Sequence, residues 1–121
     1  MTKRILVIED TEDNRQILRD LLTAAGFDLI EAVDGESGVA MAKAHTPDLI
    51  LMDIQLPVID GYEATRRIKA DPALAHIPVI AVTSYALSGD EEKTRAAGCV
   101  GYIAKPFSPR QLLGKVRELI G

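Results

Sequence analysis

Short runs of consecutive apolar residues recur along the chain. Three of them, at residues 5–8, 49–52 and 79–82, contain no polar position. A strand with one face in water alternates apolar and polar side chains, so these runs predict strands that are buried on both faces, as in a parallel sheet. Weaker runs at residues 29–32 and 101–104 predict two further strands.

The segments between these runs have the spacing of amphipathic helices. One apolar stripe precedes Gly26, and a similar stripe occupies the C-terminal segment; their members are residues 17, 18, 21, 22 and 25, and residues 112, 113, 116, 119 and 120. The capping residues that indicate helix starts are Asp34, Asp60, Ser88 and Ser108, the last followed by Pro109. Asp10 is also open to interpretation as a cap, before a helix from Thr11.

The strand–helix unit occurs five times, with short connections and no internal linker. Right-handed crossovers then predict an α/β fold with a doubly wound, five-stranded parallel sheet in the flavodoxin-like order 2-1-3-4-5. We expect one domain over residues 1–121. Because 47% of the residues are apolar, the chain can bury a core without disulfides, and Cys99 is expected to be a small buried side chain.

Charge and hydropathy argue against several classes of protein. The chain has 18 acidic and 14 basic residues and no basic block, which disfavours a nucleic-acid partner. No apolar run approaches the roughly 18 residues of a membrane span. The acidic pair Glu9 and Asp10 ends the first apolar stretch, which is unlike a signal peptide. We therefore expect a cytoplasmic domain with no membrane insertion.

Polar residues follow four of the five predicted strands. They are Glu9 and Asp10 after the first, Asp53 after the third, Thr83 after the fourth and Lys105 after the fifth. In the order 2-1-3-4-5 the first and third strands are neighbours, so their carboxylates meet at the switch point where ligands bind. Like charges in one place need compensation, and an all-oxygen site suits Mg²⁺.

These residue types together suit phosphoryl transfer. A lysine ammonium and a threonine hydroxyl beside cation-bound carboxylates can bind phosphoryl oxygens, and the central Asp53 is the natural oxygen nucleophile. Each residue alone also has an ordinary explanation, since Thr83 can be a β-branched filler and Lys105 a solvated surface charge. Their joint occurrence at one edge favours the site.

The same residues and their neighbours resemble the receiver domain of bacterial two-component response regulators. The matching motifs are Glu9-Asp10, residues 52–57 running to Asp60-Gly61, residues 82–84 and residues 105–107, and the resemblance covers the whole chain. It implies a CheY-like fold. Within the family, residues 47–57, 76–79, 89–92 and 98–99 are more similar to the single-domain cell-cycle regulators of alphaproteobacteria than to chemotaxis proteins.

The resemblance implies a metal site and a phosphoacceptor. Asp53 would accept the phosphoryl group and also bind Mg²⁺. Asp10 would be a direct ligand, Glu9 would hold metal-bound water, and the backbone carbonyl of Gln55 would be a further ligand. Glu9 is a departure, because many receivers have Asp there.

The resemblance also implies the residues that respond to phosphorylation. Thr83 and Lys105 would contact the phosphoryl oxygens, and Tyr102 would turn inward when Thr83 moves. The bond between Lys105 and Pro106 would be cis, against a general frequency of about 5%. Ser84, slightly larger than the Ala often found there, could narrow access for the phosphodonor.

The implied function is a stand-alone phosphorylation switch. A sensor histidine kinase or a histidine phosphotransfer protein would phosphorylate Asp53, and the chain would assist its own phosphorylation and dephosphorylation without being an enzyme. A downstream signalling protein would bind the face of the fourth helix, the fifth strand and the C-terminal helix. Residues 88–98 are poor in apolar side chains and are the expected bistable segment. The alternatives are a phosphorylation-independent scaffold and a receiver module of a larger hybrid kinase.

Two other classes fit the residues less well. A Mg²⁺-dependent phosphatase with an aspartate nucleophile needs a second acid two residues later, where Gln55 stands. A flavodoxin-like nucleotide-binding module needs a phosphate loop rich in Ser, Thr and Gly after the first strand. Residues 10–13 are mostly acidic instead and would repel phosphate.

Overall fold

The computed structural model describes residues 2–84 and 90–121, without the side chain of residue 90. Within these residues, five parallel strands form one sheet in the order β2-β1-β3-β4-β5. The strands are β1 (Arg4–Ile8), β2 (Asp28–Ala32), β3 (Leu49–Asp53), β4 (Val79–Thr83) and β5 (Gly101–Ala104). The helices are α1 (Glu12–Ala24), α2 (Gly35–His45), α3 (Gly61–Ala70), α4 (Asp90–Ala97) and α5 (Pro109–Ile120). The predicted fold class and strand order are confirmed.

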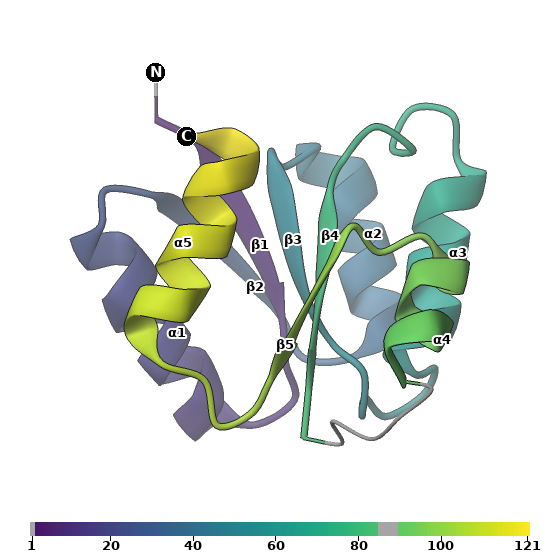
Figure 1. The fold of residues 1–121 in the computed structure, drawn as a ribbon. Coiled ribbons are helices and arrows are strands. Elements are labelled where there is room, and N and C mark those ends of the chain that lie inside the picture. The colour runs from purple at the N-terminus through teal and green to yellow at the C-terminus, as the bar shows by residue number, and fades with distance from the viewer. Residues whose placement is uncertain (1, 85–89) are drawn as a thin grey trace.

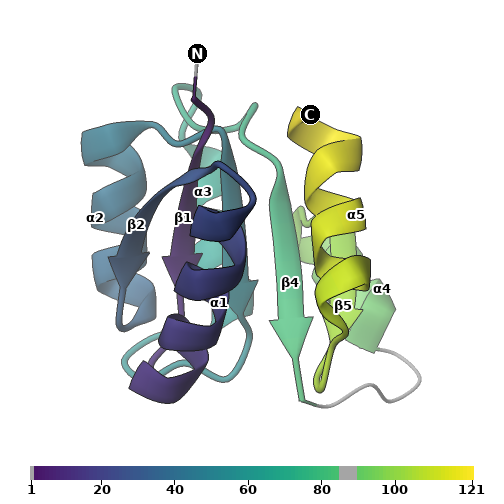
Figure 2. The ribbon, with the colours of Figure 1, turned by 90° about the vertical axis from the view of Figure 1, so that its left-hand side faces the viewer.

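The sheet is the middle of three layers. Helices α1 and α5 cover one face, and α2, α3 and α4 cover the other (Figures 1 and 2). Successive residues of β1 point into different cores, since Ile5 packs with Leu22 and Val116 on the first face, and Leu6 packs with Ile68 on the second. Burial on both faces is the reason that the strand sequences contain unbroken apolar runs.

The parallel register brings the strand ends to one edge. Ile8 pairs with Met52, Asp53 with Val82, and Thr83 with Ala104. The residues that follow β1, β3, β4 and β5 are therefore held side by side at the carboxyl edge of the sheet. The strands fix this arrangement, and the loops that leave them determine where each polar side chain points.

Helix caps set where the chain leaves this edge. Asp34, Asp60 and Ser108 each accept a hydrogen bond from a backbone N–H of the helix that follows, as predicted. The predicted cap at Ser88 lies outside the described residues. The interpretation of Asp10 as a cap is wrong, because Thr11 is the N-cap of α1 and makes no side-chain cap hydrogen bond. The carboxylate of Asp10 instead belongs to an acidic cluster.

Cys99 is buried with a reduced thiol, as expected. Across residues 2–84 and 90–121, no helix is both long and apolar enough to span a membrane.

Candidate functional site

Three carboxylates from two neighbouring strands converge at the carboxyl edge. Glu9 and Asp10 follow β1, Asp53 ends β3, and each offers an oxygen that lies within 4.8 Å of the others. The side chains of Glu9 and Asp53 are buried, whereas Asp10 is exposed. A cavity of about 250 Å³ opens over this cluster, so a small ion or a phosphoryl group has access from solvent.

Lys105 supplies the positive charge that faces this cluster. Its Nζ lies 2.8 Å from Oε1 of Glu9 and 3.3 Å from Oδ2 of Asp53. Burial lowers the pKa of Lys105, but the hydrogen bond to Glu9 and the charge of Asp53 outweigh it and raise the pKa. The peptide bond to Pro106 is cis, which is the geometry that the resemblance implies. Lys105 is therefore a cation at neutral pH.

One cation faces three acids, and both burial and this imbalance of charge shift the pKa values of the carboxyls. Burial, together with the facing carboxyl of Glu9, raises the pKa of Asp53 to about 7. Glu9 is also buried, which raises its pKa, but the hydrogen bonds to Asp53 and Lys105 prevail and lower it to about 2. Partial burial and the proximity of Glu9 raise the pKa of Asp10. The cluster is therefore short of positive charge.

The donor set fits a hard divalent cation. All the side-chain donors of the cluster are carboxylate oxygens, one carboxylate faces solvent, and the oxygens are close enough to share an ion. The backbone of Gln55 also reaches the site, because its N–H donates to Oδ1 of Asp53 over 3.1 Å. Mg²⁺ with several retained waters matches these donors, and Glu9, Asp10 and Asp53 are the side chains that would hold it.

The side chain of Gln55 makes contacts that the sequence does not predict. Its Nε2 donates to Oγ1 of Thr83 over 3.0 Å, and its Oε1 accepts from the N–H of Ser84 over 3.3 Å. The loop after β3 is thereby tied to the end of β4. The available signal is its position two residues after Asp53, from which the sequence predicts a backbone carbonyl ligand and the absence of a second acid but not these side-chain contacts.

Tyr102 lies on β5 at a distance from the acidic cluster. Its half-buried ring lines a cavity of about 190 Å³ together with Thr94 and Arg95 of α4 and Lys115 of α5. The three elements of the predicted output face therefore meet around Tyr102, with space beside the ring.

Comparison with known proteins identifies the family. The family model of the response regulator receiver domain matches residues 5–117. The chain belongs to the response regulator receiver family. It is 46% identical over 121 residues to the polar-differentiation response regulator DivK of Brucella ovis, a match that covers 100% of this chain and 98% of the relative. The DivK of Brucella anthropi is 45% identical with the same coverage.

Solved receiver structures share the fold. The receiver domain of a sensor histidine kinase from Pseudomonas aeruginosa, which holds a magnesium ion in its active-site cleft, has a TM-score of 0.93 at 38% identity and covers 100% of this chain and 99% of its own. The chemotaxis protein CheY4 of Vibrio cholerae has a TM-score of 0.93 at 25% identity, with coverage of 98% and 99%. The predicted weaker similarity to chemotaxis proteins is confirmed, because the identity to CheY4 is lower than the identity to DivK. The receiver acts in two-component signal transduction.

Proposed function

We propose that this receiver is a stand-alone cytoplasmic phosphorylation switch with Asp53 as its phosphoacceptor. The observation that carries the proposal is the position of Lys105 Nζ, which contacts both Glu9 and Asp53 beside the exposed carboxylate of Asp10. A buried nucleophile with a fixed ammonium on one side and an opening to solvent on the other is suited to accept a phosphoryl group.

The phosphodonor is the phosphohistidine of a sensor histidine kinase or of a histidine phosphotransfer protein. An oxygen of ionised Asp53 attacks the phosphorus, so that an O–P bond forms while the N–P bond breaks. The imidazole nitrogen leaves with the electron pair of that bond and takes a proton from solvent. Lys105 and the hydroxyl of Thr83 contact the phosphoryl oxygens as their charge is redistributed.

A bound Mg²⁺ would neutralise carboxylate and phosphoryl charge, and it would favour the ionised Asp53 that must attack. Glu9, Asp10, Asp53 and the backbone carbonyl of Gln55 are its proposed ligands, with Glu9 acting through water. The chain itself orients these groups: Lys105 holds Glu9, and the N–H of Gln55 holds Asp53. Because the chain is modified in the reaction, it assists the transfer without being an enzyme.

The output runs from Thr83 to the face of α4, β5 and α5. When Thr83 binds the phosphoryl group, its hydroxyl, which accepts a hydrogen bond from Gln55, donates a charge-assisted hydrogen bond to a phosphoryl oxygen. Tyr102 then turns inward and repacks this face, where a downstream signalling protein distinguishes the two states. Hydrogen bonds to charged groups contribute about 1.5–3 kcal/mol each, so two of them supply most of the roughly 5.5 kcal/mol that a complete population shift requires.

Intact-mass spectrometry tests the proposal. The protein is incubated with phosphoramidate, a small N–P donor, with Mg²⁺ or with a chelator. We expect one added phosphoryl group with Mg²⁺, little without it, and none in Asp53→Asn. Asp20→Asn, an exposed acid of α1, is the matched control and should react as the wild type does. A wild type that gains no phosphoryl group would support a phosphorylation-independent scaffold instead.

A further inference from the structure

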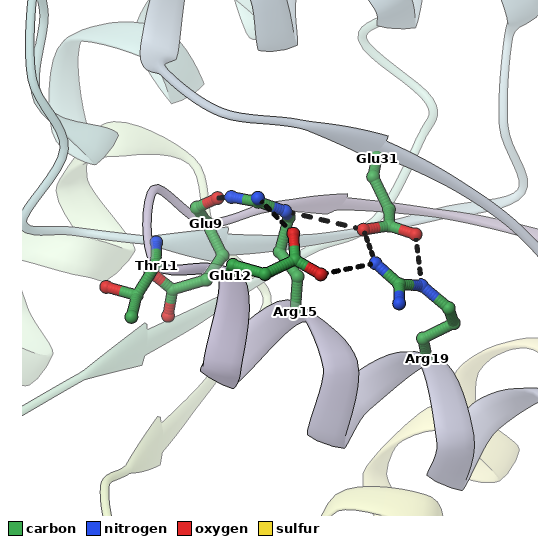
Figure 3. A network of polar contacts seen from close by, with 6 residues as sticks. All are labelled: Glu9, Thr11, Glu12, Arg15, Arg19 and Glu31. Atoms are coloured by element: carbon green, nitrogen blue, oxygen red, sulfur yellow. Dashed lines mark hydrogen bonds and ion pairs between the residues drawn. The ribbon is translucent and has the colours of Figure 1, made fainter.

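Arg15 reaches from α1 to the main chain of the acidic pair. Its Nη1 donates to the backbone carbonyl oxygen of Glu9 over 2.7 Å, and only 12% of its side chain is exposed (Figure 3). β1 ends at Ile8, so the carbonyl of Glu9 lies beyond the strand. The guanidinium supplies a donor at the place where the chain leaves the sheet.

The positive charge of Arg15 near the N-terminus of α1 does not stabilise the helix. It closes the first turn of α1, since its N–H bonds to the carbonyl of Thr11, and a cation near a helix N-terminus opposes the helix dipole. Two acids compensate for it: Glu12 lies 2.5 Å from Nη2, and Glu31 of β2 lies 3.4 Å from Nε. These two ion pairs and the hydrogen bond from Nη1 to Glu9 engage three nitrogens of the guanidinium, so its position is restricted.

Glu9 is consequently fixed at four atoms. Its N–H donates to Ala32 over 3.0 Å, its carbonyl accepts from Arg15, Oε1 contacts Lys105, and Oε2 accepts from the N–H of Thr11 over 3.3 Å. Among these contacts, the one from Arg15 is a side-chain anchor on the peptide unit that joins Glu9 to Asp10. It therefore constrains the direction in which both carboxylates leave the main chain.

We propose that Arg15 is a positioning residue for the cation site, holding the peptide between Glu9 and Asp10 so that both carboxylates converge on one ion. This inference rests on the proposed function, because it assigns a structural requirement to the same Mg²⁺ site. Hydrogen bonds that orient metal ligands typically change metal affinity by 10–100-fold when they are removed. Arg15 acts through the main chain rather than on a ligand atom, so we expect the lower end of that range.

Arg19 provides a matched control within the same network. It pairs with Glu31 through Nε at 2.7 Å and with Glu12 through Nη2 at 3.3 Å, and none of its hydrogen bonds in the described residues reaches Glu9 (Figure 3). Replacement of either arginine by Met removes one positive charge and keeps the aliphatic stem. Loss of a nearby positive charge alone strengthens the binding of a cation, whereas loss of positioning weakens it. Loss of charge alone therefore predicts a lower Kd for Mg²⁺, and loss of positioning predicts a higher one.

The experiment is a titration of the full chain with MgCl₂, followed by backbone amide NMR, for the wild type, Arg15→Met and Arg19→Met. We expect the Kd for Mg²⁺ to rise about tenfold in Arg15→Met and to stay equal or fall slightly in Arg19→Met. Equal Kd values in the two variants, or tighter binding by Arg15→Met, would overturn the inference and leave the proposed function intact. A wild type without saturable Mg²⁺ binding would overturn both.

A second variant covers the case in which Arg15→Met does not fold. Arg15→Lys keeps the charge and the stem, but a single ammonium cannot reproduce the fork that contacts Glu9, Glu12 and Glu31. Its Kd for Mg²⁺ should rise, but by less than the roughly tenfold rise expected in Arg15→Met, because part of the anchor is kept. An unchanged Kd in a folded Arg15→Lys would count against the positioning role.

Discussion

Asp53→Asn should stabilise the metal-free protein at neutral pH, although it removes the proposed nucleophile. The folded protein raises the pKa of Asp53 from 3.8 to about 7, mainly through burial. Between these two pH values the folded state binds a proton that the unfolded state has released, so the contribution of Asp53 to stability falls as the pH rises. Above pH 7 the cost of the buried carboxylate is fully present.

The size of the effect follows from the same shift. A shift of about three units in the pKa of Asp53 corresponds to about 4 kcal/mol in the free energy of unfolding. Asparagine is neutral, as protonated Asp53 is, so it avoids this cost, and Lys105 keeps its shorter contact with Glu9. The pKa of about 7 already includes the attraction between Lys105 and ionised Asp53, so we expect a stabilisation of up to about 4 kcal/mol at pH 8, or about 16 °C in Tm, for a domain of this size.

Thermal unfolding followed by circular dichroism, with a chelator present, measures this difference at pH 5 and at pH 8. At pH 5 the wild-type Asp53 is protonated in the folded state but ionised in the unfolded state, so about 1.6 kcal/mol of the cost is already present and the difference in Tm should be less than half of that at pH 8. Asp20→Asn, at an exposed position, should show no comparable change at either pH. A destabilised Asp53→Asn, or a stabilisation independent of pH, would refute the reasoning.

Further predictions concern the metal, a backbone conformation and the output face. Mg²⁺ should raise the Tm of the wild type by mass action, and Asp10→Ala should lose more than half of that shift; an unchanged shift would remove Asp10 from the ligand set. Val58 has a φ of 73° and is 69% exposed, so Val58→Gly should relieve strain and raise the free energy of unfolding by about 1 kcal/mol in urea denaturation. Tyr102→Ala should still be phosphorylated at Asp53, but beryllofluoride should shift the α4 amides much less than in the wild type. Wild-type amide shifts in this variant would assign the switch to another residue.

The central strands could be predicted because both of their faces are surrounded by apolar side chains. β1, β3 and β4 are buried on both faces, so their sequences are continuous apolar runs that leave little room for another interpretation. The meeting of Glu9, Asp53 and Lys105 could also be predicted, because a parallel sheet brings all carboxyl strand ends to one edge. The strands and the residues that meet at their ends depend on the sheet topology, and the pattern of apolar residues predicts that topology.

The contacts beyond the strand ends could not be predicted. Whether Asp10 caps α1 or joins the acidic cluster depends on the path of two loop residues, and the spacing is compatible with both. The hydrogen bond from Gln55 to Thr83 and the one from Arg15 to Glu9 depend on side-chain direction across separate loops. A sequence pattern specifies which residues share an edge, but loop geometry decides which of their atoms meet.

Chemical mapping of the phosphorylated residue tests the central claim most directly. After reaction with phosphoramidate and Mg²⁺, borohydride reduces an aspartyl phosphate to homoserine, which peptide mass spectrometry then locates in the chain. The account predicts homoserine at position 53 and an unmodified acid at position 10. Homoserine at another position, or a phosphorylated protein without any homoserine, would contradict it.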